Sequence, residues 1–315
     1  MAMSPEAIAD RRRMTRRLVV WRTVAALAAA LAIVAWAGLA GLGDLAGASG
    51  DRVAVLEVSG VIGSDRDRAD ALERVKDDDA IKALVLRIDS PGGTFVGSDD
   101  LHRRIRAVAA EKPVVAVIND VAASGGYMAA IAADRIFARR GSITASVGVI
   151  FQTPRVSRLL DSVGVDMDVW RSGELKALPS PLEPPPAAAA AQAQAMVDRL
   201  FGMFLDMVRE RRGLDDAAAA KVADGRVVTG AEALDLGLID ALGDEAAARD
   251  WLAEARNVAA DLPVEDVTPP PPLERKGMLG QALAYVLGDP APGAELALSG
   301  LLALWSPLAP AGDLR

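Results

Sequence analysis

The sequence predicts an α/β domain that follows a basic N-terminus and one membrane-spanning helix. Two observations in the chain of 315 residues support this prediction. Between residues 52 and 150, continuous runs of valine, isoleucine and leucine alternate with segments of helical spacing, a pattern typical of parallel strands covered by helices on both faces. Before these runs, residues 23–43 contain no charged side chain and have the length of about 20 residues that a spanning helix needs.

The N-terminal 22 residues are strongly basic. They carry six arginines and two acidic residues, so their net charge is +4. Arginine on this flank favours a cytoplasmic N-terminus and places the rest of the chain on the extracytoplasmic side. A cleaved signal peptide has a shorter apolar region of roughly 7–15 residues. We therefore expect residues 1–22 to be cytoplasmic and residues 23–43 to be a retained signal anchor, with cleavage near residues 46–48 as the alternative.

The first half of the domain is expected to alternate between strands and helices. Strands are predicted at residues 52–63, 83–89, 113–120 and 135–138, and helices at residues 67–80, 98–111 and 127–133. Further short strands are predicted at residues 147–150 and 165–170. The segment Ser90–Gly93 is expected to end the second strand, because Pro-Gly-Gly is ordinary turn chemistry.

The second half begins after three prolines at 184–186 with an alanine-rich helix. Apolar residues recur in this helix every four positions, at Met196, Leu200, Phe204 and Val208. Such a stripe is more typical of core packing or of an oligomer interface than of a ligand site. Residues 225–240 predict a short strand, a helix and the end of a strand. We expect the domain to span residues 48–263, followed by a proline-rich linker and apolar tail at residues 264–315.

The composition excludes several kinds of site. The chain has no cysteine and one histidine, His102, which excludes disulfides, thiol nucleophiles and multi-histidine metal sites. We therefore expect no cofactor and no metal. The whole chain has a net charge of −8, so the part after residue 22 carries −8 − 4 = −12. This charge disfavours nucleic acid as a partner, because phosphate contacts need clustered lysine and arginine.

Ser124 is a candidate nucleophile because it lies between a buried strand and two glycines that open a helix. Glycine lets the backbone approach a ligand closely, and backbone N–H groups near the nucleophile can stabilise an oxyanion. The glycines at 92 and 93 follow a neighbouring strand, and the ends of parallel strands meet at one edge of the sheet. From these residues alone, Ser124 could equally be a helix N-cap.

A serine nucleophile needs a base, and the sequence offers two kinds. His102 lies in a charged stretch with Arg103 and Arg104, so we expect it at the surface. Of the six lysines, Lys176 has apolar neighbours that could desolvate its amine and favour the neutral base. A lone lysine in a loop is otherwise an ordinary surface residue, and spacing alone does not decide between these interpretations.

Four segments together resemble the family of bacterial signal peptide peptidase A, which are serine–lysine membrane peptidases. The segments are AASGGYMAA (122–130), GSITASVGVI (141–150), SGELKALPSPL (172–182) and GRVVTGAEALDLGLID (225–240). The resemblance covers residues 52–255 and is to the short, single-copy form of the family. It implies a ClpP/crotonase-type fold of repeated β-β-α units.

The resemblance also implies the roles of individual residues. Ser124 would be the nucleophile, Lys176 the general base, and Ser146 the hydroxyl that orients the lysine. An oxyanion hole would be formed at Gly92, Gly93 and Gly125. The chain departs from the usual pattern near the site at Asp89, Leu175 and Leu182, where the family often has asparagine, an aromatic residue and phenylalanine. We expect these departures to alter packing near the site.

The implied function is that of a serine endopeptidase in the bacterial inner membrane with its catalytic domain outside the cytoplasm. Members of this family form ring- or dome-shaped homo-oligomers on membrane lipid and degrade remnant signal peptides without a cofactor. A neutral lysine base would give an alkaline pH optimum.

Three other functions remain open: a related membrane peptidase that cleaves a stomatin-type partner, a crotonase-fold acyl-CoA enzyme, and a non-catalytic membrane scaffold. An extracytoplasmic location argues against the acyl-CoA enzyme, since coenzyme A is a cytoplasmic cofactor. The complete set of motifs argues against the scaffold.

Overall fold

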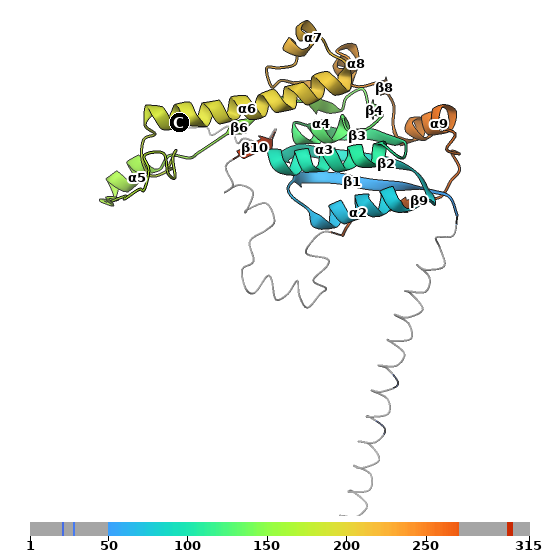
Figure 1. Cartoon of the computed structure of the whole chain (residues 1–315), viewed down its shortest axis with the longest axis horizontal. Helices are drawn as coiled ribbons and strands as arrows, with labels where there is room; N and C mark the ends of the chain where they lie inside the picture. Colours follow the sequence, from blue (N-terminus) through green and yellow to red (C-terminus); the bar gives the residue numbers. More distant parts are fainter. Residues whose placement is uncertain (1–20, 22–27, 29–49, 271–300, 305–315) are drawn as a thin grey trace, which may run out of the picture. The chain divides into compact units, whose positions relative to one another are not determined.

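The structure is a computed structural model that describes residues 50–270, the backbone of residues 301–304, and residues 21 and 28 (Figure 1). Apart from residue 28, the predicted signal anchor at residues 23–43 lies outside the described residues, as do residues 1–20 and most of the predicted tail. In the part of the chain that the structure describes, no helix has the length and apolar character needed to cross a membrane.

A parallel sheet forms the centre of the domain. Its strands lie in the order β9 (Val264–Asp266), β1 (Arg52–Ile62), β2 (Ile81–Thr94), β3 (Val114–Ala123), β4 (Arg135–Ala138) and β8 (Ala241–Leu242). Each neighbouring pair in this series is parallel. Helices connect the strands from β1 to β4. The predicted α/β class is therefore confirmed.

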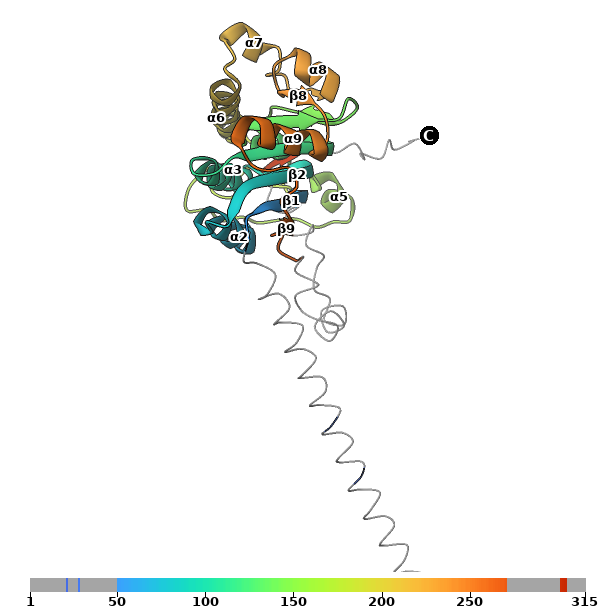
Figure 2. The ribbon, with the colours of Figure 1, turned by 90° about the vertical axis from the view of Figure 1, so that its right-hand side faces the viewer.

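Two hydrophobic cores lie on the two faces of this sheet, which explains why its strands are continuous apolar runs. Along β1, Ala54 and Leu56 belong to one core, whereas Val53 and Val55 belong to the other. The first core includes residues of α2 (Arg66–Asp77), α3 (Phe95–Ala109), α4 (Gly125–Ala130) and α6 (Ala187–Arg212). The second core includes residues of α9 (Glu245–Arg256). Figure 2 shows α2, α3 and α6 along one side of the strands.

The predicted stripe on α6 contributes to the first core. Phe204 and Val208 are fully buried, and Leu200 packs against the same core from a partly buried position. The prediction of core packing is therefore confirmed for this half of the helix. Two short helices follow α6, namely α7 (Asp216–Ala220) and α8 (Gly230–Asp235), and the short strand β7 (Val227–Thr229) lies between them.

The long strands β2 and β3 each consist of two parts with different neighbours. β3 pairs with β4 up to Ile118, and its last residues pair with β5 (Ile143–Ala145) instead. β5 in turn pairs antiparallel with β7. In β2, an irregularity between Ile88 and Ser90 separates the two parts. Two strand segments followed by a helix therefore occur at both places, as expected for β-β-α units.

The turn predicted at Ser90–Gly93 is wrong, because β2 remains extended to Thr94 and α3 follows directly. The Ser90 hydroxyl donates to the carbonyl oxygen of Gly60 on β1 at 2.6 Å. It also accepts the N–H of Gly92 at 3.1 Å. These bonds hold the glycine segment against β1 instead of letting it turn away.

A segment of the tail adds a strand beside these glycines. β10 (Leu301–Leu304) lies between β2 and β6 (Ile150–Phe151) and is antiparallel to both. Its residues 302–304 are opposite Thr94, Gly93 and Gly92. The second half of β2 therefore accepts an extended peptide segment along its edge.

Residues 152–186, which we call the arm, connect β6 to α6 and contain the short helix α5 (Ser157–Ser162). Figure 1 shows α5 and the chain beside it extending away from the sheet. The arm has contacts of its own, such as the ion pair of Arg171 with Glu183. The strand predicted at residues 165–170 is wrong, because this stretch has no strand pairing. The strand predicted at 147–150 is replaced by β5 and β6 on either side.

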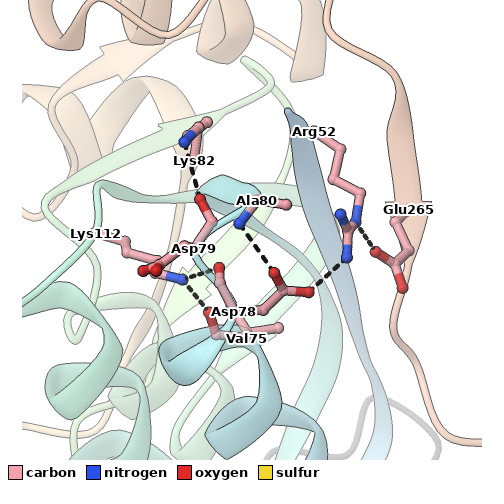
Figure 3. Close-up of polar contacts among 8 residues, drawn as sticks. All are labelled: Arg52, Val75, Asp78, Asp79, Ala80, Lys82, Lys112 and Glu265. Atoms are coloured by element: carbon pink, nitrogen blue, oxygen red, sulfur yellow. Dashed lines mark hydrogen bonds and ion pairs between the residues drawn. The ribbon is translucent and has the colours of Figure 1, made fainter. Parts of the chain in front are cut away.

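Polar contacts join three distant segments near the start of β1 (Figure 3). Arg52 forms ion pairs with Asp78, at 2.5 Å, and with Glu265 of β9. Lys112 donates to the carbonyl oxygens of Val75 and Asp78, so it satisfies carbonyl groups at the C-terminal end of α2. The ion pair of Arg52 with Glu265 helps to attach β9, which begins just after residue 263, to the sheet.

Candidate active site

Ser124 lies where β3 ends and α4 begins, in a strained backbone conformation. Its φ is 53° and its ψ is −115°, and a positive φ is uncommon for any residue other than glycine. The Ser124 N–H donates to the carbonyl oxygen of Ala145 at 2.8 Å, and its carbonyl oxygen accepts the N–H of Met128 at 2.9 Å. Strain of this kind persists only where the surroundings enforce it, and it is concentrated at functional sites.

The Ser124 hydroxyl is buried and has no hydrogen-bond partner among the described residues. An N-cap serine would accept an N–H of the helix that follows. Ser124 makes no such bond to α4. The alternative that this serine serves as an ordinary N-cap therefore does not hold in the structure.

Ser124 and Ser146 line one cavity of about 290 Å³. Ser146 also has a positive φ, of 52°, and its N–H donates to the carbonyl oxygen of Arg226 at 2.9 Å. Much of the cavity wall is apolar, with Val147, Val149, Ile150, Val197 and Phe201. The structure thus brings two of the predicted site residues together in a space that suits apolar groups.

Two acidic residues, Asp198 and Asp224, also line this cavity. Hydrogen bonds from the Arg226 guanidinium lower the pKa of Asp224, so its carboxylate remains ionised. Among the described residues there is no group of three potential metal ligands. The cavity therefore offers hydroxyl groups, apolar walls and an acidic rim.

The glycines beside the nucleophile allow two backbone segments to approach closely. A Cβ atom at Gly125 would lie 3.1 Å from the backbone nitrogen of Gly93. A Cβ atom at Gly93 would lie 1.9 Å from the carbonyl oxygen of Ile62. Of the three predicted oxyanion glycines, Gly93 and Gly125 therefore lie together. The N–H of Gly92 is bonded to Ser90 instead.

Lys176 does not line the cavity that contains Ser124. It lies in the arm and is exposed to solvent. A Ser124–Lys176 pair is thus not assembled within one chain of this structure.

His102 is buried, so the prediction of a surface position is wrong. Its side chain points from α3 toward α4, and its Nδ1 lies 2.8 Å from the carbonyl oxygen of Met128. Burial is the main cause that lowers the pKa of His102, and the neutral ring can donate its Nδ1–H to this carbonyl. His102 does not line the cavity. It therefore cannot act as the base for Ser124 in this arrangement.

One further buried hydroxyl near the nucleophile has no signal in the sequence. Ser98, in the first turn of α3, is fully buried, and its hydroxyl has no hydrogen-bond partner among the described residues. A Cβ atom at Gly125 would lie 2.1 Å from this hydroxyl oxygen. No sequence signal distinguishes Ser98 from an ordinary helix serine, because Ser98 reaches Gly125 only through the packing of α3 against α4.

Comparisons with known proteins concern the same part of the chain. The profile of Peptidase family S49 matches residues 106–259, a range that includes Ser124, Ser146 and Lys176. A Synechocystis protein that is provisionally named a protease is 35% identical over 241 residues, covering 76% of this chain and 87% of that protein. The chain belongs to peptidase family S49.

Two further comparisons concern this family and its fold. An Enterococcus faecium protein provisionally named signal peptide peptidase SppA is 29% identical to this S49 chain over 226 residues, covering 67% of this chain and 66% of that protein. The predicted resemblance to this group is therefore confirmed. Among solved structures, a ClpP1 mutant from Listeria monocytogenes aligns with a TM-score of 0.41 and 16% identity, covering 60% of this chain and 91% of that chain.

Proposed function

We propose that this S49 protein is a membrane-anchored serine endopeptidase that hydrolyses apolar peptides, with remnant signal peptides as its substrate class. The observation that carries the proposal is the state of Ser124. Its hydroxyl is buried, unpartnered and held by strained backbone at a cavity with apolar walls. A peptidase of this family needs such a nucleophile, whereas a non-catalytic scaffold would not need a strained backbone at Ser124.

In the proposed reaction, Ser124 Oγ attacks the carbonyl carbon of the scissile peptide bond. Neutral Lys176 takes the hydroxyl proton and passes it to the leaving amine, and a water molecule then releases the acyl group with the same base. The N–H groups of Gly93 and Gly125 stabilise the oxyanion, since they lie beside the nucleophile. Ser146 orients the lysine from the same cavity.

We further propose that Lys176 reaches Ser124 from a second copy of the chain. Lys176 lies in the arm, outside the cavity of its own chain. The arm exposes large apolar side chains, including Leu159 at 63%, Val163 at 64% and Trp170 at 87% of their surface. Several large apolar side chains exposed on one segment favour an interaction surface there. A homo-oligomer, ring- or dome-shaped, would cover this surface and complete each site.

The edge of β2 supports an extended peptide as the substrate. β10 pairs with Gly92–Thr94 on one side and with Ile150–Phe151 on the other. A substrate in the same place would gain backbone hydrogen bonds from both strands, a common mode of peptide recognition. This position lies beside the proposed oxyanion glycines. An acyl-CoA ligand would make no use of such pairing.

The location at the bacterial inner membrane is also part of the proposal. It is supported by the basic N-terminus and the apolar stretch at residues 23–43. With this orientation, membrane lipid is a partner of the N-terminal segment, and the catalytic domain faces cleaved signal peptides on the extracytoplasmic side.

The test is hydrolysis of a fluorogenic apolar peptide by the purified full chain in detergent. Ser124→Ala and Lys176→Ala are each expected to abolish hydrolysis, and Lys221→Ala, at the exposed lysine that follows α7, serves as the control. Mixed assemblies of the two inactive variants, co-expressed with different tags and purified through both, are expected to regain activity. Each mixed interface can then combine an intact Ser124 with an intact Lys176.

The outcomes separate the parts of the proposal. Mixed assemblies without activity would place both residues of the pair on one chain. Hydrolysis by Lys176→Ala alone would require another base. An assembled wild type that cleaves no apolar peptide would overturn the peptidase proposal itself.

A further inference from the structure

Part of the wall of the cavity that holds Ser124 belongs to α6, and one of its residues there is charged. Val197, Asp198 and Phe201 line the cavity. Val197 and Phe201 also pack against the first core, which fixes this part of α6 in place. Asp198 is exposed to solvent, so a ligand can reach its carboxylate. The helix therefore holds an accessible acidic group at the cavity of the proposed nucleophile.

The two carboxylates that line the cavity differ in their partners. Asp224 accepts a hydrogen bond from Nε of Arg226 at 2.7 Å and forms an ion pair with the same guanidinium. Asp198 accepts only the side-chain amide of Gln194, one turn earlier on α6, at 2.7 Å. Among the described residues, no lysine or arginine forms an ion pair with Asp198. The charge of Asp224 is thus compensated within the chain, whereas that of Asp198 is not.

The cavity suits a side chain that combines an apolar stem with a positive head. Its volume of about 290 Å³ lies just below the range of roughly 300–1,000 Å³ that is typical for whole small ligands, so it fits a side chain of a peptide. Lysine and arginine bury their methylene stems against apolar walls and keep the charged head at a polar edge. A carboxylate at that edge forms charge-assisted hydrogen bonds with the head. An acidic side chain would be repelled there.

We propose that Asp198 is a specificity-determining residue, which selects substrates that place a lysine or arginine side chain in the cavity beside Ser124. This inference rests on the proposed peptidase function. It narrows the substrate class to apolar peptides that contain a basic residue near the scissile bond. Asp198 takes no part in making or breaking bonds. Its contact forms when the peptide binds and persists in the transition state, so it acts through KM.

The experiment uses pairs of fluorogenic peptides that differ only in lysine or norleucine, which has the same four-carbon stem without the charge. The pair is moved in turn along an otherwise apolar peptide, and hydrolysis is measured with the assembled full chain at low ionic strength. At one position we expect the wild type to cleave the lysine peptide with about fivefold higher kcat/KM, as for a favourable ion pair near a surface. The difference should lie mainly in KM.

Asp198→Asn keeps the size of the side chain, removes its charge and is expected to abolish this preference. Asp206→Asn, at an exposed position of α6 outside the cavity, is the matched control and should keep the preference of the wild type. Asp198→Arg should instead favour glutamate over glutamine at the same position. Each preference compares two peptides on one protein sample, so it does not depend on the folded fraction.

Ionic strength provides a readout that a purely structural role of Asp198 would not change. The preference of the wild type for lysine is expected to shrink as salt is added, because exposed charges are screened. The ratio measured for Asp198→Asn should not respond to salt.

Two results would overturn the inference and leave the peptidase proposal intact: an active wild type without preference for lysine at any position, or the same preference in Asp198→Asn as in the wild type. A loss of kcat in Asp198→Asn that is equal for both peptides would place Asp198 with the proposed base Lys176 and also overturn the role in specificity. A wild type that cleaves neither peptide of any pair would overturn the proposed function itself.

Discussion

Single residues determine how closely the backbone segments approach one another around Ser124. Gly125 and Gly93 leave room where a side chain would collide with neighbouring atoms. Ser124 and Ser146 both have positive φ, so their side chains leave the line of their strands and reach one cavity. The sequence identified these four positions through its motifs. It could not show that the N–H of Gly92 is bonded to Ser90, because that bond depends on the pairing of β1 with β2.

Gly93→Ala is expected to lower the free energy of unfolding by roughly 1–3 kcal/mol, as overpacking does elsewhere. The added Cβ would lie 1.9 Å from the carbonyl oxygen of Ile62, so β1 and β2 would have to separate. Urea denaturation measures the effect. Gly141→Ala is the matched control, since nothing lies within 4 Å of a Cβ there. Equal stability of the two variants would contradict the close approach of these strands.

Asp89→Asn is expected to stabilise the protein at neutral pH. Burial is the main cause that raises the pKa of Asp89, and Asp120 and Glu57 add to the shift. The folded pKa therefore lies above the unfolded value of about 3.9, so ionisation of Asp89 destabilises the folded state as the pH rises through the folded pKa. Asparagine removes the charge and can still accept the N–H of Val121, which Asp89 binds at 3.2 Å.

Thermal unfolding between pH 3 and pH 8 tests this expectation for Asp89. The difference in Tm between Asp89→Asn and the wild type should be smallest near about pH 3, where the carboxyl is mostly neutral in both states, and should grow toward pH 7. Asp166→Asn, at an exposed position of the arm, is the control. A wild type that is the more stable protein at pH 7 would refute the expectation.

At the scale of elements, the site depends on strands that change neighbours part-way along their length. The first part of β3 pairs with β4 and its last residues pair with β5, and Ser124 follows directly. β2 continues past Ser90, and its last residues include Gly93. Continuous apolar runs predicted the first halves of these strands. The second halves could not be predicted, because glycine and proline usually end a strand and the bonds that keep β2 extended come from β1.

His102 connects α3 to α4, and this connection is expected to weaken in acid. Burial lowers the pKa of His102 and nearby Arg211 and Arg106 lower it further, whereas its bond to Met128 and the charge of Asp99 oppose the shift. The folded pKa therefore lies below the unfolded value of about 6.5. The neutral ring contributes stability that is fully present above this unfolded value and is lost as the pH falls through the folded pKa.

His102→Gln is expected to reduce this acid dependence. At pH 8 the variant should be less stable than the wild type by about 1 kcal/mol, because the buried hydrogen bond to Met128 is disturbed. Below pH 6.5 the two proteins should converge, since protonation destabilises only the wild type at this position. The test is the free energy of unfolding of both proteins, measured at pH 5 and pH 8. An equal decrease in both proteins between pH 8 and pH 5 would show that groups other than His102 cause the loss of stability in acid.

β10 occupies the edge of β2 that a peptide substrate would use, so disturbing this strand is expected to raise activity. Ala303→Pro removes the N–H at a position that is opposite Gly93, and proline is poorly tolerated within a paired strand. We expect a higher kcat/KM for an apolar peptide, mainly through a lower KM. Ala303→Ser keeps the backbone N–H and serves as the control. Equal KM values for the two variants would show that β10 does not compete with the substrate.

The arm is the feature that matters most at the scale of the whole molecule. It carries Lys176 and exposes apolar side chains that no other described part of the chain covers. The motifs assign Lys176 to the site through the family resemblance, and this assignment stays a prediction. They could not predict whether serine and lysine meet on one chain, since that depends on the direction in which residues 152–186 leave the sheet.

Trp170→Asp is expected to weaken assembly without unfolding the domain, because 87% of the Trp170 surface is exposed in the single chain. A charge in a desolvated interface is costly, so light scattering should detect smaller assemblies. Hydrolysis at a fixed chain concentration should fall at least tenfold, given that a loss of 1.4 kcal/mol in association changes the equilibrium by this factor. Asp168→Asn is the control within the arm. An unchanged mass and activity for Trp170→Asp would argue against this interface.

The separation of Lys176 from Ser124 has a consequence for the life of each newly made copy. A single folded chain whose Ser124 has no base within reach would not hydrolyse peptides. With the base supplied by a neighbour, the rate of cleavage at low abundance would rise with the square of the number of copies. The protein would then need no pro-segment to keep it harmless during synthesis, and the crowding of copies would itself serve as the trigger.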